Sequence, residues 1–251
     1  MSETISASPV TAAGGDGFIA AGRMVGAGRG WDWIASGWAL FVRQPGVWIG
    51  ITLAWLVFTA VSHFIAPLGL VNIVISPVLI GGLMLGTQAL ATDGTLTFNH
   101  LFAGFSKKFG SLLALGLLYF GSLIVIVVIA GAIMGLGVLQ AMAAGDMAQV
   151  MASGMTVLLG LLVALALLVP VAMLLWFAPA LIVLQDVGVG GAMGASFAGC
   201  LKNVIPFLVY GIVLFFPMII ATLPMGLGWL ILGPVIIAST YVAYRDIFFS
   251  R

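Results

Sequence analysis

Residues 44–92 read QPGVWIGITLAWLVFTAVSHFIAPLGLVNIVISPVLIGGLMLGTQALAT and contain no Asp, Glu, Lys or Arg. A helix needs about 20 apolar residues to cross the hydrocarbon core of a bilayer, so this stretch is long enough for two crossings if a turn divides it. The segment APLGLVN, residues 66–72, contains the Pro and Gly that interrupt helices. The stretch therefore predicts a transmembrane hairpin with helices near 46–65 and 70–91.

Three further intervals lack the same four residue types: 109–145, 147–185 and 203–244. The first two hold one crossing each, separated by QAMAAGDMAQVMASG, residues 140–154. The third holds two crossings, divided at TLPMGLG, residues 222–228. The corresponding predicted helices lie near 111–139, 155–185, 204–222 and 228–247.

The third and fourth predicted helices are about two turns longer than a bilayer requires. The excess indicates one of three arrangements: a tilt, a kink at Pro170 or Pro179, or a short protrusion from the membrane.

Composition supports a membrane protein and excludes several functional classes. Apolar residues make up 63% of the chain and the mean hydropathy is +1.30, whereas soluble domains are about 45 to 50% apolar. The net charge of +1 excludes nucleic-acid binding by the chain as a whole, because phosphate recognition needs clustered basic residues. One cysteine and two scattered histidines provide no metal-site spacing, so we expect neither a metal nor a cofactor.

The positions of the basic residues predict the orientation, because Lys and Arg in short loops stay in the cytoplasm. With six crossings, all basic residues fall on the side of the two termini. Both ends are therefore predicted to be cytoplasmic, in a bacterial inner membrane. Residues 1–27 lack the apolar run of a signal peptide and are predicted to be a flexible cytoplasmic tail before a single membrane domain at 28–251. The basic residues are Arg23, Arg29, Arg43, Lys107, Lys108, Lys202, Arg245 and Arg251.

Three segments are predicted to be amphipathic helices lying at the cytoplasmic membrane surface. The clearest is GRGWDWIASGWALFVR, residues 28–43; FNHLFAGFSKKFG, 98–110, and GAMGASFAGCLKN, 191–203, follow. The predicted lipid-facing residues are Trp31, Ile34, Trp38 and Phe41; Phe98, Leu101, Phe102 and Phe105; and Met193, Phe197, Cys200 and Leu201. The opposite faces carry Arg29, Asp32, Ser36 and Arg43; Asn99, Ser106 and Lys107; and Ser196, Lys202 and Asn203.

The three segments suggest an internal repeat. Aligning Arg43, Lys107 and Lys202 places Trp38, Phe102 and Phe197 five positions earlier in each copy, and a Pro-Val pair recurs in the second, fourth and sixth predicted crossings. We expect three parallel units, 28–93, 94–186 and 187–251, each an amphipathic helix followed by a transmembrane hairpin. The alternative is that any protein built from membrane hairpins alternates basic surface segments with apolar crossings.

Separated motifs also resemble those of a family of polytopic bacterial inner-membrane proteins of unknown function. These motifs are GRGWDWIASGWALF, HLFAGF, WFAPALIVL, LKNVIPFLVYG and YVAYRDIF, within about residues 28–249. A remoter similarity is to the membrane domain of some glycerophosphodiester phosphodiesterases. The chain has no catalytic domain beside it, so the resemblance implies a membrane fold and no activity.

Two groups of candidate site residues follow from these patterns. The possible lipid or partner contacts are Trp31, Trp38, Arg43, Phe102, Lys107, Lys108, Phe197 and Lys202. A possible ion-pair cluster at the cytoplasmic helix ends comprises Asp186, Arg245 and Asp246. The simpler alternatives are determinants of topology for the basic residues and ordinary solvated helix-end charges for the cluster.

The predicted crossings contain almost no ionisable residues, so we predict no catalytic residues and no enzymatic activity. The leading hypothesis is a membrane protein that organises lipids or a partner membrane protein at its basic, aromatic cytoplasmic face. The alternative is a transporter or channel for a small or lipid-like solute. A central cavity lined by groups such as Gln88, Gln185, Tyr241 or Tyr244 would favour transport, and a packed centre would oppose it.

Overall fold

The computed structural model describes residues 17–92, 94–144 and 147–250. Within these ranges the chain is helical, apart from one isolated β-bridge between Phe18 and Phe249. Six segments are long and apolar enough to cross a membrane. The prediction of an all-helical, multi-pass membrane protein is therefore confirmed at this level.

The helices divide into long and short elements. The long ones are α2 (Pro45–Phe64), α3 (Ala66–Thr92), α5 (Phe109–Ala144), α6 (Met147–Leu175), α9 (Val204–Thr222) and α10 (Trp229–Phe248). The short ones are α1 (Arg29–Phe41), η1 (Phe98–Phe102), α4 (Ala103–Lys107), α7 (Ala178–Gln185) and α8 (Val189–Lys202).

Two predicted loops are shorter than expected. The turn predicted at 66–72 is helical, and only Ile65 separates α2 from α3. Pro67 is tolerated there because the first turn of a helix does not use its backbone N–H groups internally. Most of the loop predicted at 140–154 is also helical, since α5 runs to Ala144 and α6 begins at Met147.

The fourth predicted helix is broken near Pro179, one of the two prolines at which a kink was expected. Pro179 has no backbone N–H and would clash with the carbonyl of residue 175 in a continuous helix, and α6 ends at that residue. The hydroxyl of Ser196 in α8 fills the gap: it accepts the Phe177 N–H at 2.9 Å and donates to the Met173 carbonyl at 2.7 Å. A side chain inserted between an N–H and its helical acceptor is a known cause of such breaks.

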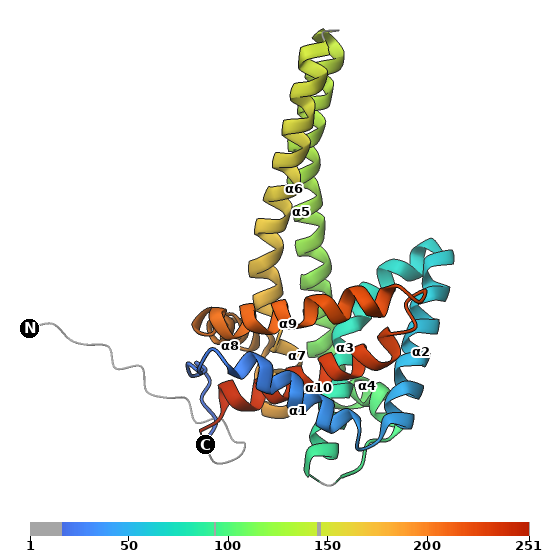
Figure 1. The fold of residues 1–251 in the computed structure, drawn as a ribbon, viewed down its shortest axis with the longest axis vertical. Coiled ribbons are helices and arrows are strands. Elements are labelled where there is room, and N and C mark those ends of the chain that lie inside the picture. The colour runs from blue at the N-terminus through green and yellow to red at the C-terminus, as the bar shows by residue number, and fades with distance from the viewer. Residues whose placement is uncertain (1–16, 93, 145–146, 251) are drawn as a thin grey trace, which may run out of the picture.

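The helices form a body from which one hairpin projects. Figure 1 shows α5 and α6 extending together well beyond the other elements, while α9 runs across the direction of this hairpin. With 36 residues, α5 is about 54 Å long at 1.5 Å per residue, more than the roughly 30 Å of a bilayer core. The six long helices are therefore not arranged as a simple parallel bundle.

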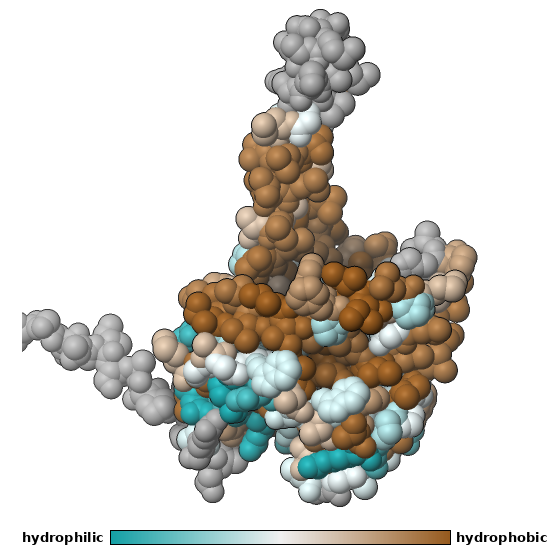
Figure 2. All heavy atoms as spheres, in the orientation of Figure 1, coloured by the Kyte–Doolittle hydropathy of each residue, from teal (hydrophilic) through white to brown (hydrophobic). Residues whose placement is uncertain are grey.

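Hydrophilic residues gather at the end of the body away from the hairpin tip (Figure 2). Hydrogen bonds and ion pairs connect the helix ends there. They join α1 to α10, Arg43 in the turn after α1 to α3, and Lys108, just before α5, to the residue after α7. We call this end the polar face. It comprises Arg23, Arg29, Asp32, Arg43, Lys107, Lys108, Asp186, Lys202, Arg245 and Asp246.

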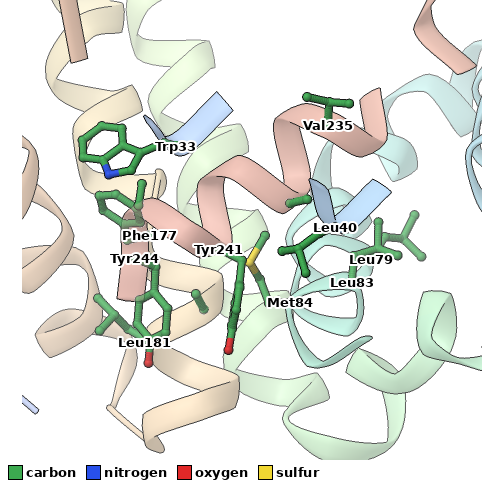
Figure 3. Packing of buried hydrophobic residues seen from close by; sticks show 14 of the residues in the cluster. Trp33, Leu40, Leu79, Leu83, Met84, Phe177, Leu181, Val235, Tyr241 and Tyr244 are labelled. Atoms are coloured by element: carbon green, nitrogen blue, oxygen red, sulfur yellow. The ribbon is translucent and has the colours of Figure 1, made fainter. Parts of the chain in front are cut away.

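The core surrounds α10, with large buried side chains from several helices (Figure 3). Helix α1 runs antiparallel along the second half of α10, since Trp33 contacts Asp246 and Gly37 meets Ser239. A Cβ at Gly37 would lie 2.7 Å from the Ser239 nitrogen, so only glycine permits this approach. α1 is thus packed into the body, rather than lying only on its surface as predicted.

The order of elements agrees with the predicted repeat, because one or two short helices precede two long ones three times along the chain. The arrangement of the three sets differs, since only α5 and α6 form a projecting hairpin (Figure 1). The threefold repeat therefore stays a prediction.

Candidate functional site

The polar face is built around Asp246, near the end of α10. Its carboxylate accepts hydrogen bonds from Arg23 Nη2 at 2.9 Å, Arg29 Nε at 2.6 Å and Trp33 Nε1 at 3.0 Å. Hydrogen bonds to an ionised carboxylate are among the strongest in proteins, and in the two from arginine both partners are charged. The hydrogen bond to Asp246 raises the pKa of Arg29 above its ordinary value. Asp246 therefore joins α10 to α1 and to the segment before α1.

That segment, residues 17–27, is docked on the body, whereas the sequence predicted a flexible tail over 1–27. Ile19 and Arg23 donate backbone N–H groups to the carbonyls of Phe248 and Ile247, both at 2.8 Å. The predicted tail is therefore wrong for residues 17–27. Residues 1–16 lie outside the described part of the chain.

Two residues at the C-terminal end of α8, Lys202 and Asn203, also hold this segment. The buried amide of Asn203 accepts the Val25 N–H and donates to the Arg23 carbonyl, both at 2.8 Å. The Lys202 ammonium donates to the carbonyls of Ala21 and Gly22 at 2.8 and 3.0 Å. Lys202, predicted to contact lipid or a partner, instead uses two of its three donors inside the protein.

The predicted cluster of Asp186, Arg245 and Asp246 is not formed. Asp186 adopts a left-handed conformation at φ 56° after α7, which short polar residues tolerate, and it pairs with Lys108. The Arg245 guanidinium lies over the ring of Phe249, 4.1 Å from its centroid. Each of the three is therefore engaged separately, because α10 places its two neighbouring charges on different faces.

The predicted aromatic contacts are on the surface, with one exception. The side chains of Trp31 and Trp38 are 59% and 49% exposed, and Phe102 is also exposed. Phe197 is half-buried. Arg43 is exposed and donates a hydrogen bond to the Leu90 carbonyl at 3.2 Å, near the C-terminal end of α3. Lys107 is exposed at the end of α4.

Sequence reasoning missed the inward-facing residue of α1, Trp33, which is fully buried. It packs between the rings of Phe207 and Tyr210 on α9, with centroids 5.3 and 6.2 Å away. A signal was present in the sequence: Gly30 and Gly37 lie three and four residues from Trp33, and all three are buried. Small residues at this spacing mark a face that approaches another helix closely.

Two of the three polar residues assigned to the solvated face of α8 face inward instead. Ser196 and Asn203 are fully buried, whereas Leu201 is exposed. Cys200, which was predicted to face lipid, is buried within the protein, and burial raises the pKa of its thiol to about 12. A thiol with such a pKa is almost wholly protonated near neutral pH and is a poor nucleophile.

Beside these contacts the body has three sizeable hollows. A groove of about 680 Å³ lies between α1, α9 and α10, with Trp31 and Trp38 among its lining residues. An apolar chamber of about 420 Å³ lies between α3, α5, α6, α7 and α10, and a pocket of about 310 Å³ lies between α1, α3 and α10. Their sizes are in the range of small-molecule sites, about 300 to 1,000 Å³.

Within the described ranges, no three His, Cys, Asp or Glu side chains come together as metal ligands would. Comparison of the chain with protein-family models, with curated proteins and with solved structures finds no match.

Proposed function

We propose that this chain is a non-enzymatic, multi-pass protein of a bacterial inner membrane that organises lipids at the aromatic surface of α1. The observation that carries the proposal is the 680 Å³ groove between α1, α9 and α10, whose lining is almost entirely apolar. Trp31 and Trp38 stand exposed at this groove. Tryptophan rings favour the region where lipid headgroups meet hydrocarbon, so they suit a groove that receives acyl chains.

The distribution of charge supports a cytoplasmic polar face. Described basic residues are located at the helix ends of this face, and the tip of the α5 and α6 hairpin points away from it (Figures 1 and 2). The positive-inside rule then directs the polar face to the cytoplasm and the hairpin tip to the opposite side.

The proposed lipid binding depends more on the exposed aromatic residues than on the basic residues. Arg23, Arg29 and Lys108 form ion pairs within the protein, and Lys202 binds backbone carbonyls. A basic residue near an anionic membrane surface contributes about 1 kcal/mol to binding, and one already engaged with protein groups contributes less. Among the described basic residues, exposed Lys107 and Arg245 make no hydrogen bond or ion pair, and Arg245 lies over the Phe249 ring instead.

The proposal is tested by counting bound lipids on the full chain after extraction in mild detergent. We expect the double variant Trp31→Ala with Trp38→Ala to retain fewer lipids by native mass spectrometry while inserting normally. The matched control is Phe215→Ala with Phe216→Ala, which removes two exposed rings of α9 that do not line the groove. Equal lipid retention in both double variants would contradict the proposal.

A second candidate function, passage of a lipid-like solute, is favoured by the 420 Å³ chamber. The chamber lies among five helices at the base of the projecting hairpin, and its lining is mainly apolar. Such a chamber suits an apolar molecule and opposes passage of ions. Uptake of a fluorescent lipid into proteoliposomes that hold the full chain tests this candidate; a rate equal to that of empty liposomes would exclude it.

A further inference from the structure

Two of the hollows follow the same seam between α3 and α10. The apolar chamber is lined by Ser76, Ile80 and Met84 from α3 and by Ile236, Ile237 and Thr240 from α10. The pocket is lined farther along the same helices by Gln88 and Thr92 from α3 and by Tyr241 and Arg245 from α10. The chamber and the pocket therefore form successive parts of one seam.

Less than two helical turns separate the two hollows. Met84 lines the chamber and Gln88, one turn later in α3, lines the pocket. On α10, Thr240 lines the chamber and the next residue, Tyr241, lines the pocket. Methionine is unbranched and changes rotamer easily. A bound acyl chain could therefore displace the Met84 side chain at the boundary between the two hollows.

The pocket carries hydrogen-bond donors that the protein does not use. Gln88 and Tyr241 have side chains without a hydrogen-bond partner among the described residues, and no described carboxylate pairs with Arg245. The contact with the Phe249 ring holds the Arg245 guanidinium in place. Residues that carry a guanidinium, a phenol and an amide thus line one pocket, and these groups are suited to bind oxygen atoms of an anion.

The chamber has the opposite chemistry. Its walls are aliphatic and aromatic, with Ser76, Tyr119 and Thr240 as the polar exceptions. The hydroxyl of Ser76 already donates to the Ile73 carbonyl at 2.9 Å, and that of Thr240 to the Ile236 carbonyl at 2.8 Å. Pro77 has no N–H to give to the Ile73 carbonyl, so Ser76 replaces that donor. The chamber therefore offers an apolar surface to an occupant.

We infer that the seam between α3 and α10 binds a single-chain anionic lipid, with its acyl chain in the chamber and its anionic head at Arg245, Tyr241 and Gln88. The inference deepens the proposed handling of lipids by assigning one of them a defined site. This site is separate from the α1 groove, since the two have no lining residue in common.

Trp176 makes the inference testable, because it lines the chamber and its fluorescence is quenched by bromine atoms at contact. The full chain in nanodiscs of zwitterionic phosphatidylcholine is titrated with 9,10-dibromostearate. We expect a quenching component that saturates at about one molecule per chain, disappears in Trp176→Phe, and is displaced by stearate but not by its uncharged methyl ester. Quenching that rises without saturation, as for dibromostearate dissolved in the bilayer, would overturn the inference.

Three variants separate the head site from the chain site. Arg245→Gln should weaken saturable binding about tenfold, the factor expected for one lost hydrogen bond to a charged group, and Arg245→Lys should restore part of it. Ala172→Phe should fill the chamber and abolish the saturable component. Ala35→Phe fills the α1 groove instead and is the matched control, expected to bind dibromostearate normally.

The outcomes also separate this inference from the proposed function. If Ala35→Phe and the double tryptophan variant lose bound lipids while dibromostearate still saturates, both hold at separate sites. If lipid retention depends on the α1 groove but dibromostearate binds Arg245→Gln as tightly as the parent chain, the seam inference fails and the proposed function stands. If dibromostearate binding saturates but lipid retention does not depend on Trp31 and Trp38, the proposed function at α1 fails and the seam inference stands.

Discussion

Of two membrane-length segments of this protein, 154–185 and α10, the more hydrophobic one, 154–185, is the less buried within the protein. An 18-residue stretch of the first has a mean hydropathy of 2.9 and is only 6% buried within the protein, whereas the corresponding stretch of α10 has a mean hydropathy of 1.3 and is 56% buried. In water the more apolar helix would be the core. In a bilayer the lipid tails are as apolar as leucine side chains, so burial follows close packing and hydrogen bonding. The least hydrophobic long helix is therefore the centre of this fold.

The largest expected effect contrasts two tryptophans of α1. Trp33→Ala removes a fully buried ring and its hydrogen bond to Asp246, and should lower the free energy of unfolding by about 3 to 5 kcal/mol. Trp31→Ala removes an exposed ring and should change it by less than about 0.5 kcal/mol. Denaturant unfolding of the full chain in detergent measures both. Similar losses in the two variants would show that α1 is not packed on α10 as described.

A smaller loss is expected when the charge at the end of α10 is removed. Asp246→Asn leaves Arg23 and Arg29 without their shared carboxylate, and because both arginines are partly exposed the cost should be near the lower limit for a broken buried pair, about 3 kcal/mol. The control is Asp32→Asn, which breaks only the exposed pair between Arg29 and Asp32 and should cost about 0.5 kcal/mol or less. Limited proteolysis before residue 29 should quicken in Asp246→Asn alone.

Two glycines of α5 test the boundary between body and hairpin. A Cβ at Gly116 would lie 1.9 Å from the Val74 carbonyl oxygen of α3, whereas nothing lies within 4 Å of one at Gly121. Gly116→Ala should therefore destabilise the protein by about 1 to 3 kcal/mol. Gly121→Ala should be neutral, or stabilising by up to about 1 kcal/mol, because alanine is the better helix former. Thermal unfolding of both variants in one detergent provides the measurement, and equal midpoints would contradict the described packing.

The smallest expected effect concerns the pair of Lys108 and Asp186. Asp186 is largely exposed, so Lys108→Ala should cost only about 0.2 to 1 kcal/mol and the cost should shrink as salt is added. The free energy of unfolding of the parent chain and of Lys108→Ala is measured at low and at high ionic strength. A loss above about 2 kcal/mol that salt does not reduce would mean that this pair is shielded from solvent.

The sequence predicted which segments are membrane-length helices, because a run without charged residues can be recognised whatever surrounds it. It did not predict how those helices pack. The helical-wheel argument assigned Ser196 and Asn203 to a solvated face, yet both bind backbone groups inside the body. Those backbone groups became available because Pro179 interrupts a helix and because residues 17–27 dock, and neither event has a local signature at α8.

The same limit applies to the candidate site. The exposure of Trp31 and Trp38 on α1 was predicted from their spacing, but Phe41, assigned to the same face, is buried. The partners of the charges were not, because Asp246 is 223 positions away from Arg23 in the sequence. The spacing of two glycines four residues apart, which allows close helix contact, occurs at Gly82 and Gly86 and again at Gly131 and Gly135. Gly82 and Gly86 lie against the backbone or side chain of His100, but a Cβ at Gly131 or Gly135 would meet nothing within 4 Å. The sequence alone does not distinguish the two pairs.

The long sequence separation of that ion pair has a consequence for biogenesis. Arg23 is synthesised early, and its carboxylate partner is added 223 residues later. At about 5 to 20 residues per second, the segment before α1 waits roughly 10 to 45 s on the ribosome before its docking surface exists. During that interval α1 lacks Asp246 and a complete α10, so the first described helix can take its final place only after the last described one has been made.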